Sequence, residues 1–67
     1  MVRDPELAEL PPFATRQQVA SYTQISVPTL ARWAMNREGP RVTKIGRAAR
    51  YRKADVLEWL EALAEAG

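Results

Sequence analysis

The segment TRQQVASYTQISVPTLARWAMN, residues 15–36, decides the fold of this chain. Thr15, followed three residues later by Gln18, has the pattern of a capping box, so a helix is predicted to begin here. Ser26 is a second N-cap candidate, and Pro28 follows in the first turn, where its missing N–H costs no hydrogen bond. Two helices joined by a short turn form a helix-turn-helix.

The first of these helices is expected to end near Thr23, and the second helix is expected to bury one face. Leu30, Trp33 and Ala34 follow one another at helical spacing and form an apolar stripe that should face inward. The helix is predicted to end before Pro40, which cannot continue it.

Residues 41–52 have a composition typical of β-strands. Val42, Ile45 and Tyr51 are strand-forming residues, and Gly46 interrupts them as a turn residue would. We therefore predict a hairpin of two strands, Arg41–Ile45 and Ala49–Arg52, with its tip at 46–48. A two-stranded ribbon is marginal alone, so it should lie against the helices, with an outer side that is almost wholly basic.

A third helix is predicted from about Ala54, with Asp55 in its first turn. Its apolar positions recur at helical spacing and should close the core: Val56, Trp59, Leu60 and Leu63. Three glutamates, Glu58, Glu61 and Glu65, are expected on the solvent side.

The first twelve residues are predicted to form an N-terminal extension to a domain spanning 13–67. Asp4 and Pro5 are start signals for a short helix, which Pro11 and Pro12 would stop.

Length and composition exclude several classes of function. The chain has 67 residues, no cysteine and no histidine. It therefore lacks thiolate and imidazole metal ligands, cysteine nucleophiles and the commonest general base. We expect no enzyme activity, no metal and no cofactor. The absence of a long apolar run or a signal-peptide pattern predicts a cytoplasmic domain.

The charge is strongly divided along the chain, although the net charge is only +2. Residues 14–53 hold nine cations against Glu38 alone, whereas residues 54–67 hold four acids and no cation. Eight of the ten cations are arginines, which suit phosphate and guanine recognition. A basic middle framed by acidic ends predicts a polyanionic partner. The alternative, a charged surface that serves only solvation, accounts for only part of this charge distribution.

The order helix, turn, helix, hairpin, helix, together with several short motifs, resembles the excisionase and MerR-type branch of winged helix-turn-helix DNA-binding domains. The motifs are Gln18-Val19-Ala20, Ile25-Ser26, Thr29-Leu30, Arg32-Trp33, Lys44-Ile45-Gly46-Arg47, Arg50-Tyr51-Arg52, Asp55-Val56 and Trp59-Leu60. Two positions depart from that family: Gln24 stands where it usually has Gly, and Pro28 where it often has a polar residue. The resemblance implies a mostly α fold with a small β-hairpin.

The small excisionases of phages, also called recombination directionality factors, look most similar within that branch. The resemblance implies cooperative binding to repeated sites, bending of attachment-site DNA, and promotion of excision by a phage integrase. The acidic ends and basic centre would allow further copies to contact one another head to tail on DNA. A small phage or bacterial transcription regulator of the same fold is the alternative. A third hypothesis is that the face with Glu58, Glu61 and Glu65 binds a basic protein partner.

Double-stranded DNA would be read by the second helix, because the major groove admits one α-helix. Arg32 is the first candidate for contact with guanine. The candidates in and beside this helix are Ser26, Pro28, Thr29, Arg32, Asn36 and Arg37. The candidates in the hairpin, acting as a wing, are Lys44, Arg47, Arg50 and Arg52. Arg16, in the first turn of its helix, would contact the DNA backbone.

Several of these side chains also have a structural interpretation. Trp33 and Trp59 could stack on bases, but their inward helical positions favour the core. The ring of Tyr51 is expected in the core with its hydroxyl at the surface. Arg52 could pair with Asp55 instead of binding DNA.

Overall fold

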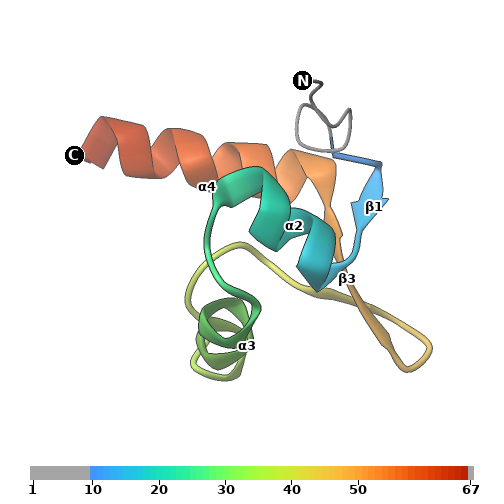
Figure 1. Ribbon diagram of the computed structural model, residues 1–67. Helices are drawn as coiled ribbons and strands as arrows, with labels where there is room; N and C mark the ends of the chain where they lie inside the picture. The colour runs from blue at the N-terminus through green and yellow to red at the C-terminus, as the bar shows by residue number, and fades with distance from the viewer. Residues whose placement is uncertain (1–9, 67) are drawn as a thin grey trace, which may run out of the picture.

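The computed structural model describes residues 10–66. Three helices and three short strands follow one another in these residues, and they form a winged helix-turn-helix. In Figure 1, α3 and the tip of the β2–β3 hairpin occupy the lower side of the molecule, and α4 runs along the upper side. The elements are β1 (Phe13–Ala14), α2 (Arg16–Thr23), α3 (Val27–Met35), β2 (Thr43–Ile45), β3 (Ala48–Arg52) and α4 (Lys53–Ala66).

Helices α2 and α3 begin where their capping residues predict. The Thr15 hydroxyl accepts a hydrogen bond from the Gln18 N–H at 3.0 Å, and the Gln18 side chain accepts one from the Thr15 N–H at 2.8 Å. This reciprocal capping box is confirmed. Ser26 caps α3 by accepting a hydrogen bond from the Thr29 N–H at 3.3 Å. Both starts therefore depend on contacts within four residues of chain.

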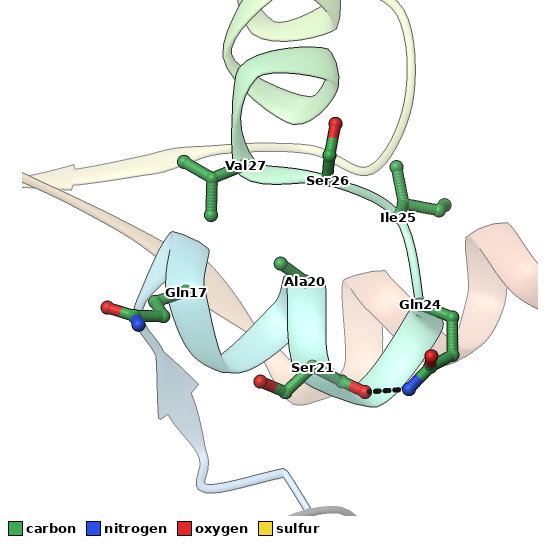
Figure 2. A pocket seen from close by; sticks show the side chains of 7 residues that line it. All are labelled: Gln17, Ala20, Ser21, Gln24, Ile25, Ser26 and Val27. Atoms are coloured by element: carbon green, nitrogen blue, oxygen red, sulfur yellow. Dashed lines mark hydrogen bonds between the residues drawn. The ribbon is translucent and has the colours of Figure 1, made fainter.

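The turn between α2 and α3 uses a left-handed residue. Gln24 has a φ of 65°, the conformation in which glycine is usual. Its side chain donates a hydrogen bond to the Ser21 carbonyl at 3.0 Å, which partly offsets the strain. Figure 2 shows the small Ala20 side chain facing the start of α3 across an open hollow of about 450 Å³.

Helix α3 ends in a Schellman motif. The Glu38 N–H donates to the Trp33 carbonyl at 2.7 Å, and the Arg37 N–H donates to the Ala34 carbonyl at 3.4 Å. Arg37 occupies the left-handed position of this motif, with a φ of 60°. Gly39 follows with a φ of +73°, and a Cβ there would lie 2.9 Å from the Trp33 ring. The glycine therefore lets the chain pass closely over α3.

The sheet has three antiparallel strands in the order β1-β3-β2, so the prediction of a two-stranded hairpin was incomplete. Two residues before α2 pair with β3, Phe13 opposite Arg52 and Ala14 opposite Tyr51. No propensity signal marks so short a strand. The hairpin itself is shorter than predicted at its start. Its turn is Gly46-Arg47, because Ile45 pairs directly with Ala48.

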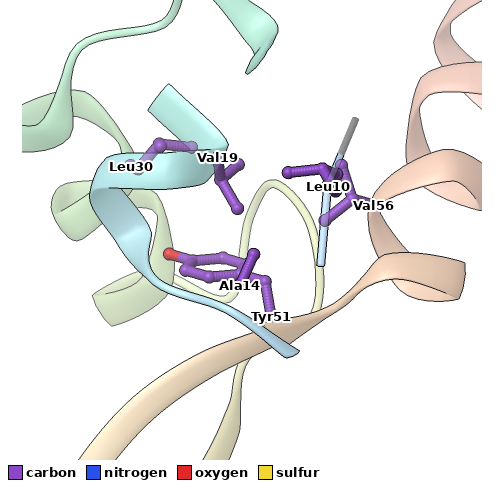
Figure 3. Close-up of a cluster of buried hydrophobic side chains, with 6 residues drawn as sticks. All are labelled: Leu10, Ala14, Val19, Leu30, Tyr51 and Val56. Atoms are coloured by element: carbon purple, nitrogen blue, oxygen red, sulfur yellow. The ribbon is translucent and has the colours of Figure 1, made fainter. Parts of the chain in front are cut away.

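The core lies where β3, α2, α3 and α4 meet. Its fully or almost fully buried hydrophobic side chains are Leu10, Ala14, Val19, Leu30, Tyr51 and Val56. Figure 3 shows the Tyr51 ring lying across this cluster, with its oxygen pointing away from Leu10 and Val56. The expectation that the Tyr51 hydroxyl reaches the surface was therefore wrong, since the whole residue is 0% exposed.

Helix α4 begins at Lys53 and closes the core only with its first half. Val56 is buried and Trp59 and Leu60 are half-buried, but Leu63 is 50% exposed. The expectation that Leu63 completes the core was wrong, because the helix runs past the elements it packs on (Figure 1). Within residues 10–66, none of the helices combines the length and apolar character needed to cross a bilayer.

The predicted short helix at the N-terminus falls mostly on residues 1–9, outside the residues that the structure describes. Leu10, at the end of that segment, is 4% exposed and belongs to the core. The Pro12 carbonyl accepts a hydrogen bond of 2.9 Å from the Lys53 N–H, which links the chain before β1 to the start of α4.

Candidate nucleic-acid interface

The exposed face of α3 carries the residues predicted to read DNA. Pro28 and Arg32 are both exposed and lie one helical turn apart on the same face. Asn36 is also exposed, at the C-cap, and Arg37 follows it. Leu30 is buried and Trp33 half-buried on the opposite side, so the predicted inward position of these two residues is confirmed. Thr29 and Ala34 are both half-buried and lie at the borders between the two sides.

Ser26 and Thr29 are tied to each other at the start of α3. The Ser26 hydroxyl donates a hydrogen bond of 2.9 Å to the Thr29 hydroxyl, in addition to capping the helix. Both side chains therefore have structural partners in the free protein. Thr29 is half-buried and Ser26 exposed.

A cleft of about 460 Å³ separates α3 from the hairpin. Small and apolar side chains form much of its lining: Ala31, Ala34, Met35, Val42 and Ala49. Two cations, Arg16 from α2 and Lys44 from β2, complete it. The hollow between α2 and α3 has a similar size but no charged residue in its lining (Figure 2), so the cleft beside the hairpin is the one of the two that offers cationic side chains to an anion.

Arg16 reaches the cleft from the first turn of α2. Its Nε donates a hydrogen bond of 3.0 Å to the Tyr51 hydroxyl. Its guanidinium carbon lies 5.8 Å from the centroid of the Tyr51 ring. These two residues are 35 positions apart in sequence. No local pattern could have indicated this contact.

The hairpin divides its cations between two faces of the sheet. Lys44 pairs with Ala49 and shares a face with Tyr51, which is the face toward α3. Arg50 and Arg52 alternate with Tyr51 and lie on the opposite face. That outer face also carries Phe13 and Ile45, each 50% exposed, so the expectation that it is almost wholly basic was wrong.

Arg47 is exposed at the tip of the hairpin, in the two-residue turn. Gly46 precedes it with a φ of +63°, which a tight hairpin turn requires. Arg50 is half-buried, and its Nη1 donates a hydrogen bond of 2.9 Å to the Ala49 carbonyl.

Arg52 is paired with Asp55, the structural interpretation left open by the sequence. Its Nε and Nη2 donate to the two carboxylate oxygens at 3.0 and 3.2 Å. This hydrogen-bonded pair lowers the pKa of Asp55 and raises the pKa of Arg52. The Arg52 side chain is still 50% exposed, whereas that of Asp55 is 10% exposed.

The two tryptophans are packing residues. The Trp33 and Trp59 rings meet edge to face, with centroids 5.8 Å apart and planes at 60°. Both are half-buried, and Trp33 also packs against the core, so the pair joins α3 to α4. This arrangement supports the core interpretation over base stacking.

A known family model, described as a helix-turn-helix domain, matches residues 15–64 of this chain. The matched residues include α2, α3 and the β2–β3 hairpin. The chain belongs to this family. The helix-turn-helix domain family includes excisionase-like DNA-binding proteins, and membership indicates binding to double-stranded DNA. Comparison with curated proteins and with solved structures gives no significant match.

The helix-turn-helix domain thus has a candidate interface that runs from α3 across the cleft to the hairpin tip. Sequence reasoning placed Arg32, Lys44 and Arg47 on it but missed two features. It missed the small alanines that open the cleft, and it missed the bond between Arg16 and Tyr51.

Proposed function

We propose that this helix-turn-helix domain is a sequence-specific, architectural DNA-binding protein. The observation that carries the proposal is the placement of charge. Arg32 on α3 and Arg47 at the hairpin tip belong to elements on the side of the molecule away from α4 (Figure 1), and Arg16 and Lys44 line the cleft between α3 and the hairpin. The exposed side of α4, by contrast, carries glutamates. A polyanion is attracted to the first side and repelled by the second.

Helix α3 would enter the major groove with Arg32 foremost. An arginine can hold guanine O6 and N7 together, and such a contact discriminates by about 1–3 kcal/mol. Pro28, Asn36 and Arg37 would contact flanking bases or phosphates. Ser26 and Thr29 would contribute from the helix start, where exposed amides also favour phosphate.

The wing would contact the backbone and the neighbouring minor groove. Arg47 projects from the narrow turn that is best placed to enter a minor groove, where arginine senses A·T tracts. Lys44 would bind a phosphate from the sheet face toward α3. Arg50 and Arg52 would contact phosphates from the opposite face of the wing, Arg52 while paired with Asp55.

The role we propose is that of a phage excisionase acting on DNA in the cytoplasm of a bacterial host cell. The short motifs that resemble this group support it, as does the charge division along the chain. Copies would bind repeated sites head to tail, the acidic α4 of one copy near the basic wing of the next, and would bend attachment-site DNA for an integrase. We propose no catalytic activity.

Two substitutions test the division of labour between helix and wing. Sites would first be selected from a randomised duplex pool, and affinities for the selected duplex and a scrambled duplex then compared. Arg32→Ala should lower the preference between them by about five- to fiftyfold, because it removes base readout. Arg50→Ala should weaken both duplexes alike, because it removes a phosphate contact. If both variants lost the preference for the selected duplex equally, the assignment of base readout to Arg32 and of a phosphate contact to Arg50 would be wrong.

Footprinting on DNA flanking the gene and its attachment site tests the biological role. Several spaced footprints that appear together as protein is added are expected for an excisionase. A lone footprint beside a promoter would overturn that role in favour of a small transcription regulator.

A further inference from the structure

The cleft between α3 and the hairpin contains a charged side chain that is held by a buried hydroxyl. Tyr51 is 0% exposed, and its hydroxyl accepts the hydrogen bond from Arg16 Nε. An unpaired hydroxyl at this depth would be costly, and no buried side-chain polar atom in residues 10–66 lacks a partner. The bond is therefore part of the free protein and does not await a ligand.

This bond uses only one of the five N–H donors of the guanidinium. Within the described residues, the two amino groups of Arg16 donate to no other group. No group in residues 10–66 therefore competes for them with a ligand in the cleft that Arg16 lines. A planar guanidinium held at one edge presents its other edge in a fixed direction, which suits two-point contact with a phosphate.

Tyr51 is a rigid support for this arrangement. Its ring packs in the cluster that contains Val19, Leu30 and Val56, so the hydroxyl cannot shift without disturbing the core (Figure 3). An arginine ordered before binding loses less conformational entropy when the ligand arrives. Tyr51 thus affects binding without touching the ligand.

The cleft has further features that suit a sugar–phosphate chain. Lys44 supplies a second positive charge from the facing strand. Ala31, Ala34 and Ala49 keep the space open and apolar, which suits the deoxyribose carbons on either side of a phosphate. Arg32 and Arg47, on the two elements that flank the cleft, would meet the same DNA strand on either side.

We propose that Tyr51 is a positioning residue that orients Arg16, so that Arg16 and Lys44 together bind one backbone phosphate of duplex DNA in this cleft. The inference rests on the proposed DNA-binding function. It adds a specific site for a phosphodiester and a role for a residue that contacts no DNA.

The test is the affinity of Tyr51→Phe for a short mixed-sequence duplex at low ionic strength. This change keeps the ring and removes the hydroxyl. Affinity should fall by about three- to tenfold, in the range of couplings between contacting groups. Tyr22→Phe is the matched control, since Tyr22 lies on α2 and is half-buried, and it should bind like the wild type. Thermal unfolding of both variants shows whether the fold is retained.

A double substitution shows whether Tyr51 acts through Arg16. Arg16→Ala should lower affinity and reduce the slope of log affinity against log salt by about one phosphate contact. Adding Tyr51→Phe to Arg16→Ala should change neither quantity further. Additive losses, or a Tyr51→Phe variant that binds like the wild type, would overturn the positioning role while leaving DNA binding intact. A wild-type protein that binds no duplex at all would overturn the proposed function itself.

The wild-type protein provides a second readout if Tyr51→Phe does not fold. In nuclear magnetic resonance spectra of the free protein, the Nε–H proton of Arg16, assigned with Arg16→Lys, should exchange with water much more slowly than that of exposed Arg32. Adding the duplex should then order its amino groups. Exchange as fast as that of Arg32 would refute the inference.

Discussion

Helices α3 and α4 share a construction but present opposite charges to solvent. Each buries one apolar stripe, and the two meet through the Trp33–Trp59 contact. The exposed face of α3 carries Arg32 and no acid, whereas after Lys53 the exposed face of α4 carries glutamates and no cation. The buried faces therefore build the fold, and under the proposed function the exposed faces decide which side of the molecule DNA can approach.

The two helices also end differently. α3 is closed by local hydrogen bonds at both ends, through Ser26 and the Schellman motif at Arg37. α4 continues beyond its packing partners, as the half-exposed Leu63 shows. Local hydrogen bonds at both ends stabilise α3 in a way that the far end of α4 lacks. The three predictions below test how far this difference matters.

Removing the contact that joins the helices should have the largest effect. Trp59→Ala should lower the free energy of unfolding by about 2–3 kcal/mol, because it deletes a half-buried aromatic ring and leaves Trp33 without its edge contact. This is a large share of the stability available to a domain of this size. Urea unfolding followed by circular dichroism would measure it.

Leu63→Ala is the control for that experiment, on the same helix but beyond the core. It should change the free energy of unfolding by no more than about 0.5 kcal/mol. Equal losses in the two variants would mean that the second half of α4 supports the fold as much as the first.

Relieving the strain at the end of α3 should have an intermediate effect of opposite sign. Arg37 has a φ of 60°, where glycine has no steric penalty. Arg37→Gly should raise the free energy of unfolding by about 0.5–1 kcal/mol, after allowing for the greater entropy of the unfolded chain. The same variant should bind duplex DNA more weakly, because a cation is lost.

Arg37→Ala separates these two effects, since it removes the charge but keeps a side chain in the left-handed conformation. It should bind as weakly as Arg37→Gly without the gain in stability. If Arg37→Gly were less stable than the wild type, the Schellman position would not be strained.

The smallest effect is expected at the start of α4, where Asp55 pairs with Arg52. The pair lowers the pKa of Asp55 in the folded state, mainly through the hydrogen bonds from Arg52. The ionised carboxylate therefore stabilises the fold above its unfolded pKa of about 3.9, and this stability is lost as pH falls through the folded-state pKa. Asp55→Asn should reduce the fall in melting temperature between neutral and strongly acidic solution.

Glu58→Gln is the matched control, an exposed acid of the same helix with no ion pair in the described residues. It should leave the acid dependence of the melting temperature close to that of the wild type. If acid lowered the melting temperature of Asp55→Asn as much as that of the wild type, the Arg52–Asp55 pair would add nothing to stability.

Much of the fold could be predicted because its signals are local. Thr15 with Gln18, and Ser26 with the turn that follows, specify helix starts within four residues. Arg32 could be placed on the exposed face of α3 because the apolar stripe defines the buried one. The length of α4 that packs was overestimated, since periodicity continues to Leu63 whether or not a partner reaches it.

The sequence by itself determined the helix starts, the turn positions and the division of charge, because these depend on neighbouring residues and on composition. Only the tertiary structure decided that Phe13 and Ala14 become a third strand, that Lys44 faces α3 while Arg50 faces away, and that Arg16 meets Tyr51. Those outcomes join residues distant in the chain. They depend on register and packing among several elements, which no stretch of sequence specifies alone.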